Sequence, residues 1–147
     1  MKSKPKTVLL VEDEPLLGEL MTEALIDKGF AVVASTDADG ALRHLLTGAD
    51  CDILFTDIDL GEGMDGATLA QLVHEMRPAL TIVYTSGRRS LHEFAAVPGA
   101  AFLPKPYSLS DVDRMIAQKL EEAELGATRP FRRARETAPA NGYGNRR

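Results

Sequence analysis

Near the middle of the chain lies the stretch Asp52-Ile53-Leu54-Phe55-Thr56-Asp57-Ile58-Asp59-Leu60-Gly61. A short apolar run that ends in an acid just before a glycine-containing turn is typical of a buried strand. In open α/β sheets the ligand crevice lies beyond the carboxyl ends of the strands. We therefore expect Asp57 to lie at the edge of the sheet where ligands bind, with the other elements arranged around it.

Strands and helices alternate on both sides of this stretch. Runs rich in β-branched and aliphatic residues predict four further strands, over residues 7–11, 30–35, 80–85 and 100–103. Apolar residues at helical spacing, with glycine and proline as stop signals, predict helices over residues 15–29, 38–46, 65–77 and 88–96, and a last helix from residue 108 or 110 onward. This alternation predicts an α/β fold with a doubly wound five-stranded parallel sheet and helices on both faces.

The composition suits one domain built on an aliphatic core. The 147 residues include no Trp, and 5% are aromatic, so Leu, Val, Ile and Ala must fill the interior. The single cysteine, Cys51, excludes an internal disulfide and fits a reducing compartment. No signal peptide is recognisable, and no apolar run approaches the roughly 18 residues of a membrane span. We expect a soluble, cytoplasmic protein with no membrane partner.

The net charge of -5 combines an acidic body with a basic end. Residues 1–124 hold 11 basic and 21 acidic side chains, whereas residues 125–147 hold six Arg and one Glu. We expect residues 1–125 to form the domain and residues 126–147 a basic, disordered tail without apolar periodicity. Such a tail is too short for a helix-turn-helix, so no DNA-binding domain is expected. Contact of the tail with nucleic acid, anionic lipid or an acidic partner is left open.

The residues at the predicted strand ends form a chemically distinctive set. Glu12 and Asp13 follow the first strand, Asp57 ends the third, Thr85 ends the fourth and Lys105 follows the fifth. Three carboxylates close together repel one another unless a cation lies among them, and Mg²⁺ prefers such oxygen ligands. Lys105 adds a positive charge, and Thr85 adds a hydroxyl donor, for phosphate oxygens. The set therefore predicts a Mg²⁺ site that handles a phosphate group.

These residues resemble those of the receiver domain of bacterial two-component response regulators. The resemblance spans nearly all of residues 6–124, and it includes Met64-Asp65-Gly66 and Lys105-Pro106 besides the residues at the strand ends. Each motif alone is weak, but all of them occur in order at the family's spacings. The resemblance implies the flavodoxin-like receiver fold and a phosphorylation-dependent signalling protein of the stand-alone type, not an enzyme.

By this resemblance Asp57 is the phosphoacceptor, which takes a phosphoryl group from a histidine kinase or a histidine phosphotransfer protein. Asp13 and Asp57 bind Mg²⁺ directly, the main-chain carbonyl of Asp59 is a third ligand, and Glu12 acts through bound water. Lys105 neutralises charge on the phosphoryl oxygens during the transfer.

The resemblance also implies a switch. Thr85 moves toward the new phosphoryl oxygen and Phe102 follows it inward, although a place in the core is an equal alternative for Phe102. The Lys105–Pro106 peptide bond is expected to be cis, as in the family. Output is expected through protein–protein contacts with an unknown downstream target, and a homodimer is left open.

The chain departs from the commonest family form in two places. The loop after the third strand is one residue longer, and the segment from Thr85 to Lys105 is somewhat short. The short segment puts the helix predicted over residues 88–96 in question, and with it the usual dimer surface. Asp59 and Gly87 fall at positions that, by the resemblance, tune the lifetime of the acyl phosphate.

Two other functions fit part of the pattern. Asp57-Ile58-Asp59 matches the Asp-x-Asp motif of haloacid-dehalogenase-like phosphatases, in which the first Asp is the nucleophile and the second a general acid and base. That motif usually ends the first strand of its domain, whereas Asp57 ends the third, and Glu12 and Asp13 would have no role. A non-phosphorylated receiver-like binding module is the second alternative, but such modules tend to lose one of the residues present here.

Overall fold

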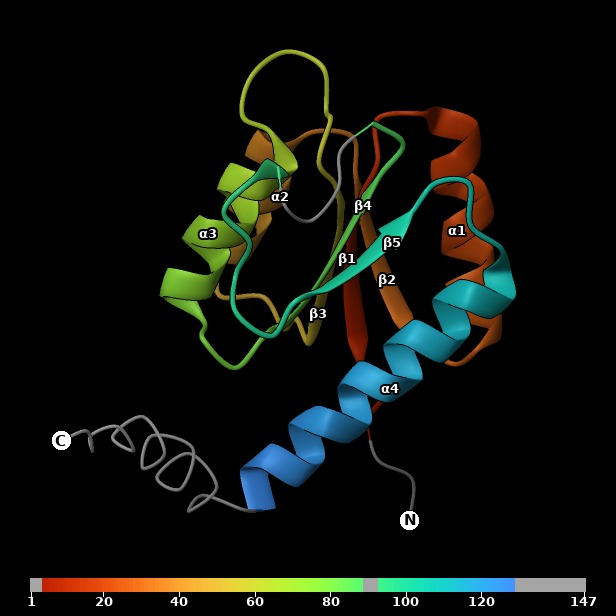
Figure 1. Cartoon of the computed structure of the whole chain (residues 1–147), viewed down its shortest axis with the longest axis vertical. Helices are drawn as coiled ribbons and strands as arrows, with labels where there is room; N and C mark the ends of the chain where they lie inside the picture. The colour runs from red at the N-terminus through yellow and green to blue at the C-terminus, as the bar shows by residue number, and fades with distance from the viewer. Residues whose placement is uncertain (1–3, 89–92, 129–147) are drawn as a thin grey trace, which may run out of the picture.

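The computed structural model describes residues 4–88 and 93–128 and contains a five-stranded sheet (Figure 1). Its strands lie in the order β2-β1-β3-β4-β5. Their bounds are β1 (Thr7–Val11), β2 (Ala31–Ser35), β3 (Ile53–Asp57), β4 (Thr81–Ser86) and β5 (Ala101–Pro104). Every neighbouring pair is parallel, which confirms the predicted doubly wound sheet.

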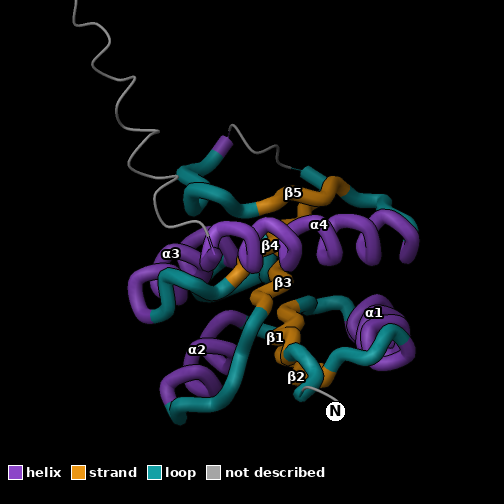
Figure 2. Tube along the Cα trace, turned by 90° about the horizontal axis from the view of Figure 1, so that it is seen from below, coloured by secondary structure: helices purple, strands orange, loops and turns teal. Residues whose placement is uncertain are grey.

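Helices cover both faces of this sheet (Figure 2). They are α1 (Pro15–Asp27), α2 (Ala38–Leu46), α3 (Gly66–Met76) and α4 (Leu109–Thr128). One core cluster joins the sheet to α2 and α3, and a second joins it to α1 and α4. Apolar side chains of each helix pack against the sheet, as their spacing predicts, but Leu16 and Leu20 of α1, which were expected in the buried stripe, are exposed. Within the described ranges, no helix combines the length and the apolar character needed to cross a membrane.

The central strand β3 has a neighbour on each side and helices over both faces, so all of its residues are buried. Leu54 packs into the cluster with α2 and α3, while Ile53 and Phe55 pack into the cluster with α1 and α4. Because successive side chains point to opposite faces and both faces are covered, a continuous apolar run marks this strand. The run ends at Asp57, at the carboxyl edge of the sheet.

Acidic caps define where the helices on one face begin. Asp37 accepts a hydrogen bond from Gly40 N at 2.7 Å at the start of α2, and Asp65 accepts one from Thr68 N at 2.8 Å at the start of α3. The Asp65 cap ends the loop that leads from β3 to α3. That loop carries the residues that follow the acid at the strand end.

The structure differs from the sequence-based expectation at two connections. The helix expected over residues 88–96 falls partly on residues 89–92, which lie outside the described residues; Glu93 has 3₁₀ geometry, and residues 94–96 are not helical. Helix α4 runs on to Thr128, past the domain boundary expected at residue 125, although Gly126 and Thr128 are weak helix formers. The rest of the expected tail lies outside the described residues.

Candidate functional site

The carboxyl edge of the sheet brings together the side chains expected there. Asp57 is the last residue of β3 and lies in register with Thr85 of β4, while Glu12 follows β1 directly. Lys105 follows β5, and its backbone N–H donates to Ser86 O at 2.9 Å, which extends the ladder between β4 and β5. Parallel pairing therefore places the predicted residues at one edge.

Three carboxylates meet at this edge. Glu12, Asp13 and Asp57 each offer one oxygen, and the three oxygens lie within 4.8 Å of one another. Glu12 is 5% and Asp57 4% exposed, whereas Asp13 is open to solvent. Oxygens so arranged suit one shared hard divalent cation. The carboxylates of Asp13 and Asp57, predicted as direct ligands, thus lie together with Glu12, predicted to act through water, while these roles and that of the Asp59 main-chain carbonyl stay predictions.

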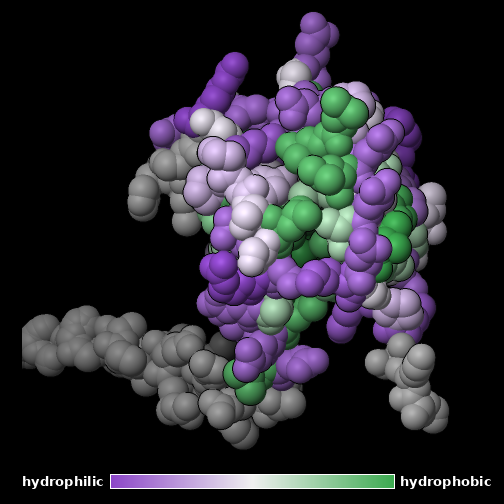
Figure 3. Space-filling model, turned by 90° about the vertical axis from the view of Figure 1, so that its right-hand side faces the viewer, coloured by the Kyte–Doolittle hydropathy of each residue, from purple (hydrophilic) through white to green (hydrophobic). Residues whose placement is uncertain are grey.

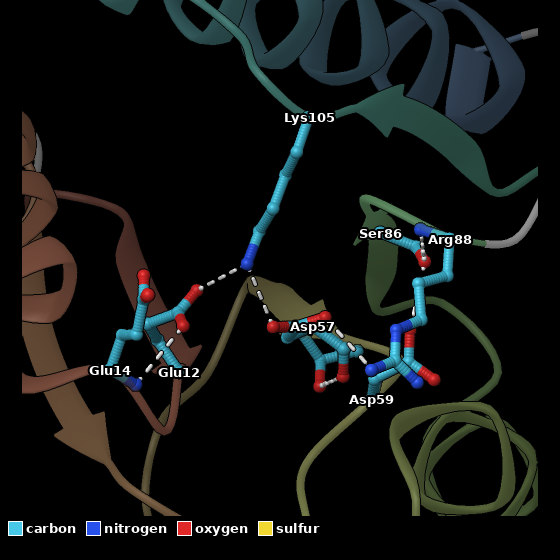
Figure 4. Close-up of polar contacts among 8 residues, drawn as sticks. Glu12, Glu14, Asp57, Asp59, Ser86, Arg88 and Lys105 are labelled. Carbon is cyan, nitrogen blue, oxygen red and sulfur yellow. Dashed lines mark hydrogen bonds and ion pairs between the residues drawn. The ribbon is translucent and has the colours of Figure 1, made fainter.

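Lys105 extends toward the acid cluster from the end of β5 (Figure 4). Its Nζ lies 2.8 Å from Asp57 Oδ2 and 3.4 Å from Glu12 Oε1. Because both acids are nearly buried, water screens these ion pairs less than it screens pairs on the surface. The other oxygen of Glu12 accepts a hydrogen bond from Glu14 N at 3.1 Å.

Burial raises the pKa of Asp57 and the pKa of Glu12 above their ordinary values. The ammonium of Lys105 opposes the rise in both groups, and the Glu14 N–H opposes it in Glu12. Burial acts to lower the pKa of Lys105, but the hydrogen bond and charge of Asp57, together with Glu12, raise it overall. Two nearly buried acids and Asp13 thus face one lysine, an excess of negative charge that a cation would balance.

The raised pKa values predict how stability depends on pH. Between the ordinary carboxyl pKa of about 4 and the raised value, the folded chain binds more protons than the unfolded chain. The free energy of unfolding therefore falls as the pH rises through this window. Glu12→Gln removes one of the two groups, so its melting temperature should match that of the wild type near pH 4 and exceed it by a few degrees at neutral pH, as followed by circular dichroism.

Glu122→Gln provides a control of opposite sign. The hydrogen bond that Lys119 donates to Glu122, followed by its charge, lowers the pKa of this exposed carboxyl group. Removing that charge should leave the protein no more stable than the wild type at neutral pH. A Glu12→Gln variant that melts below the wild type at neutral pH would show that the ion pair with Lys105 outweighs burial.

The loop after Asp57 is held against the end of β3. Asp59 N–H donates to Asp57 Oδ1 at 3.1 Å, and Gly66 N–H donates to Ile58 O at 2.9 Å. A side chain at Gly66 would overlap the main-chain oxygen of Asp57, to which Thr56 Oγ1 also donates at 2.9 Å. In the sequence Gly66 stands out only as part of a motif. Its close approach to the strand end becomes visible once the fold is known.

Thr85 lies on β4, the neighbour of β3, and Phe102 lies on β5, the outermost strand on that side of the sheet. Thr85 is fully buried, and its Oγ1 has no hydrogen-bond partner among the described residues. Because buried hydroxyls are almost always paired, Thr85 is poised to bind a group that enters the site. Phe102 is half-buried against the cluster with α2 and α3, which leaves both of its expected roles open. The Lys105–Pro106 peptide bond is cis, as expected.

Two further residues of the site were not predicted from the sequence. Ser86 Oγ donates to Asp59 Oδ2 at 2.9 Å and accepts a hydrogen bond from Arg88 N at 3.1 Å. The contact joins residues 27 positions apart and depends on the register of β3 and β4. No local pattern in the sequence could have indicated it.

The chain matches the family model of the response regulator receiver domain over residues 8–117. Similar proteins include the nitrogen assimilation regulatory protein NtrX of Azorhizobium caulinodans, at 31% identity over 133 residues, and the sensor kinase CckA of Brucella abortus, at 31% over 122 residues. The alignments cover 88% and 80% of this chain but 28% and 13% of the two relatives. The chain thus corresponds to a minor part of each relative.

Among solved structures, a response regulator receiver protein from Sinorhizobium medicae is similar to this chain, with a TM-score of 0.76 and 32% identity. The match covers 82% of this chain and 98% of that one. The family model spans the strand ends that carry Glu12, Asp57 and Lys105. The chain belongs to the response regulator receiver domain family of two-component systems.

Proposed function

We propose that this chain accepts a phosphoryl group on Asp57 from the phosphohistidine of a histidine kinase or of a histidine phosphotransfer protein. The observation that carries the proposal is the setting of Asp57. Its carboxylate is nearly buried at the sheet edge, lies 2.8 Å from Lys105 Nζ and is grouped with Glu12 and Asp13. A nucleophile, a fixed positive charge and a cation site are what an in-line phosphoryl transfer requires.

In the proposed step an oxygen of Asp57 attacks phosphorus as the bond from phosphorus to the donor histidine nitrogen breaks. The bonding electron pair stays on the imidazole, and Asp57 becomes an acyl phosphate. Lys105 neutralises negative charge on the transferred group, because its Nζ already lies beside the attacking carboxylate. The Asp59 N–H, 3.1 Å from Asp57 Oδ1, orients that carboxylate for attack.

Mg²⁺ is the proposed cofactor. The cluster fits it, because three carboxylate oxygens lie within 4.8 Å of one another and Asp13 leaves the site open to solvent. Asp13 and Asp57 would bind the ion directly with the main-chain carbonyl of Asp59, and Glu12 would act through water. When bound, the ion supplies positive charge that stabilises the phosphoryl oxygens during transfer.

Thr85 is the proposed switch residue. Its hydroxyl is buried without a partner and lies in register with Asp57, so a phosphoryl oxygen on Asp57 offers it an acceptor. Movement of Thr85 toward that oxygen vacates space next to β5. Phe102, half-buried on β5, is the side chain proposed to fill that space.

The proposed partner binds the face that carries α1. Figure 3 shows apolar side chains exposed among polar ones on this side of the molecule. Leu16 is 81% and Leu20 53% exposed on α1, near the strand end that carries Glu12 and Asp13. Exposed apolar patches of this kind mark protein contacts. We propose that a histidine kinase or a phosphotransfer protein binds at this face. Output would then occur through contacts with a further protein. The basic residues that follow α4 in the sequence are proposed not to belong to the receiver domain.

Acetyl phosphate with Mg²⁺ tests this function, followed by intact mass and by released phosphate. We expect the purified chain to gain the mass of one phosphoryl group only when Mg²⁺ is present, and the adduct to accumulate. Phosphate release over many turnovers without a lasting adduct would instead favour the phosphatase alternative that uses Asp57 and Asp59. If neither adduct nor release appears, the same assay with a phosphorylated histidine phosphotransfer domain decides between a receiver and a binding module.

A further inference from the structure

The side chain of Asp59 is bound on the side away from the acid cluster. Its Oδ2 accepts a hydrogen bond from Ser86 Oγ at 2.9 Å, and the side chain of Arg88 extends toward it (Figure 4). Ser86 is 1% exposed at the end of β4, and Arg88 N–H donates to its hydroxyl at 3.1 Å. A chain of polar contacts therefore runs from Arg88 through Ser86 to the Asp59 carboxylate.

The backbone of Asp59, by contrast, lies directly at the phosphoacceptor. Its N–H is 3.1 Å from Asp57 Oδ1, so one methylene group separates this backbone from a second carboxylate. The segment is also anchored from the other side, because Ile58 N–H donates to Thr85 O at 2.9 Å. Rotation of the Asp59 side chain is therefore what decides whether a carboxylate faces Ser86 or a group bound to Asp57.

A carboxylate that faced the acyl phosphate would promote its hydrolysis. As a general base it would take a proton from water while the water oxygen attacks phosphorus. The bond from phosphorus to the Asp57 oxygen would break, its electron pair would return to the Asp57 carboxylate, and phosphate would leave. The position of the Asp59 side chain therefore bears on how long the phosphorylated state lasts.

We propose that Ser86 and Arg88 are positioning residues that hold the Asp59 carboxylate away from Asp57 and thereby lengthen the life of the acyl phosphate. The inference rests on the proposed function, because it needs a phosphoryl group on Asp57. Ser86 provides the hydroxyl donor and Arg88 provides a backbone N–H that orients this hydroxyl. The guanidinium adds positive charge on the same side of Asp59.

The test measures decay of the adduct after acetyl phosphate has been removed by desalting. Ser86→Ala should shorten the half-life about tenfold, the effect of losing one hydrogen bond to a charged group. Arg88→Gln keeps the backbone N–H and loses the charge, so its effect should be smaller and in the same direction. In an Asp59→Asn background, Ser86→Ala should have no further effect on the half-life, because no base is left to release.

Asp37→Ala is the control for stability alone. It removes the cap of α2, which follows β2, a strand separated from β3 by β1, and should lower the melting temperature without changing the half-life. The proposal would be overturned if Ser86→Ala had the same half-life as the wild type. It would also be overturned if Ser86→Ala shortened the half-life by the same factor when Asn replaces Asp59. If the wild-type chain formed no adduct with acetyl phosphate or with a phosphorylated histidine phosphotransfer domain, that result would count against the proposed function. It would not count against the hydrogen bond between Ser86 and Asp59.

Discussion

Asp57→Asn is expected to gain no phosphoryl group from acetyl phosphate under conditions in which the wild-type chain is labelled. The amide is close to the carboxylate in shape, so the strand end and its hydrogen bond from Asp59 N–H should persist. It is nevertheless a poor nucleophile and cannot form an acyl phosphate. Lys105 retains Glu12 at 3.4 Å as an ionic partner, so we expect the fold to remain intact. Intact mass and circular dichroism on the same sample measure both results.

Asp52→Asn is the matched control on the same stretch. Asp52 precedes β3 at the opposite end of the strand, where its Oδ2 accepts a hydrogen bond from Thr7 N at 2.8 Å. Asn retains an oxygen that can accept this bond, so this variant should be labelled at the wild-type rate. If Asp57→Asn were labelled as fully as Asp52→Asn, the acceptor would have to be another side chain.

Much of this site can be predicted from the sequence, because the order of strands and helices determines which residues lie at the same edge of the sheet. Once the alternation of strands and helices indicates a parallel sheet, the carboxyl ends of neighbouring strands must share an edge. Glu12, Asp57, Thr85 and Lys105 all come at such ends, so their meeting needs no knowledge of side-chain conformations. The cluster of carboxylates and its contact with Lys105 are consequences of topology.

The features that were missed depend on side-chain geometry or on local stability. The hydrogen bond from Ser86, at the end of β4, to Asp59, in the loop after β3, needs the exact rotamers of both side chains, which no spacing encodes. The last helix was expected to give way to a tail at residue 126, but α4 continues to Thr128, because helix ends fray and have no sharp signal in the sequence. In each case the competing states differ by small energies that periodicity does not capture.

The close approach of α3 to the end of β3 is a third feature that was not predicted from the sequence. It predicts a large loss of stability when a side chain is added at Gly66. Gly66→Ala is expected to destabilise the protein by on the order of 3 kcal/mol, as overpacking against backbone does. The new Cβ would overlap the main-chain oxygen of Asp57 and lie 2.9 Å from Thr56 Oγ1. Neither group can move freely, since β3 is the central strand and Gly66 N–H is bound to Ile58 O.

For a domain of this size that loss corresponds to a fall in melting temperature of about 10 °C. Thermal and urea unfolding measure it, and Gly18→Ala is the control. Gly18 lies inside α1, where a Cβ would meet Glu12 Cγ at 3.9 Å, an ordinary contact, so alanine should leave stability unchanged or raise it by up to about 1 kcal/mol. Equal stability of the two variants would mean that α3 can withdraw from β3 at little cost. The main-chain carbonyl of Asp57 would then not be fixed by this helix, and its position would have to be set by the hydrogen bonds of the loop alone.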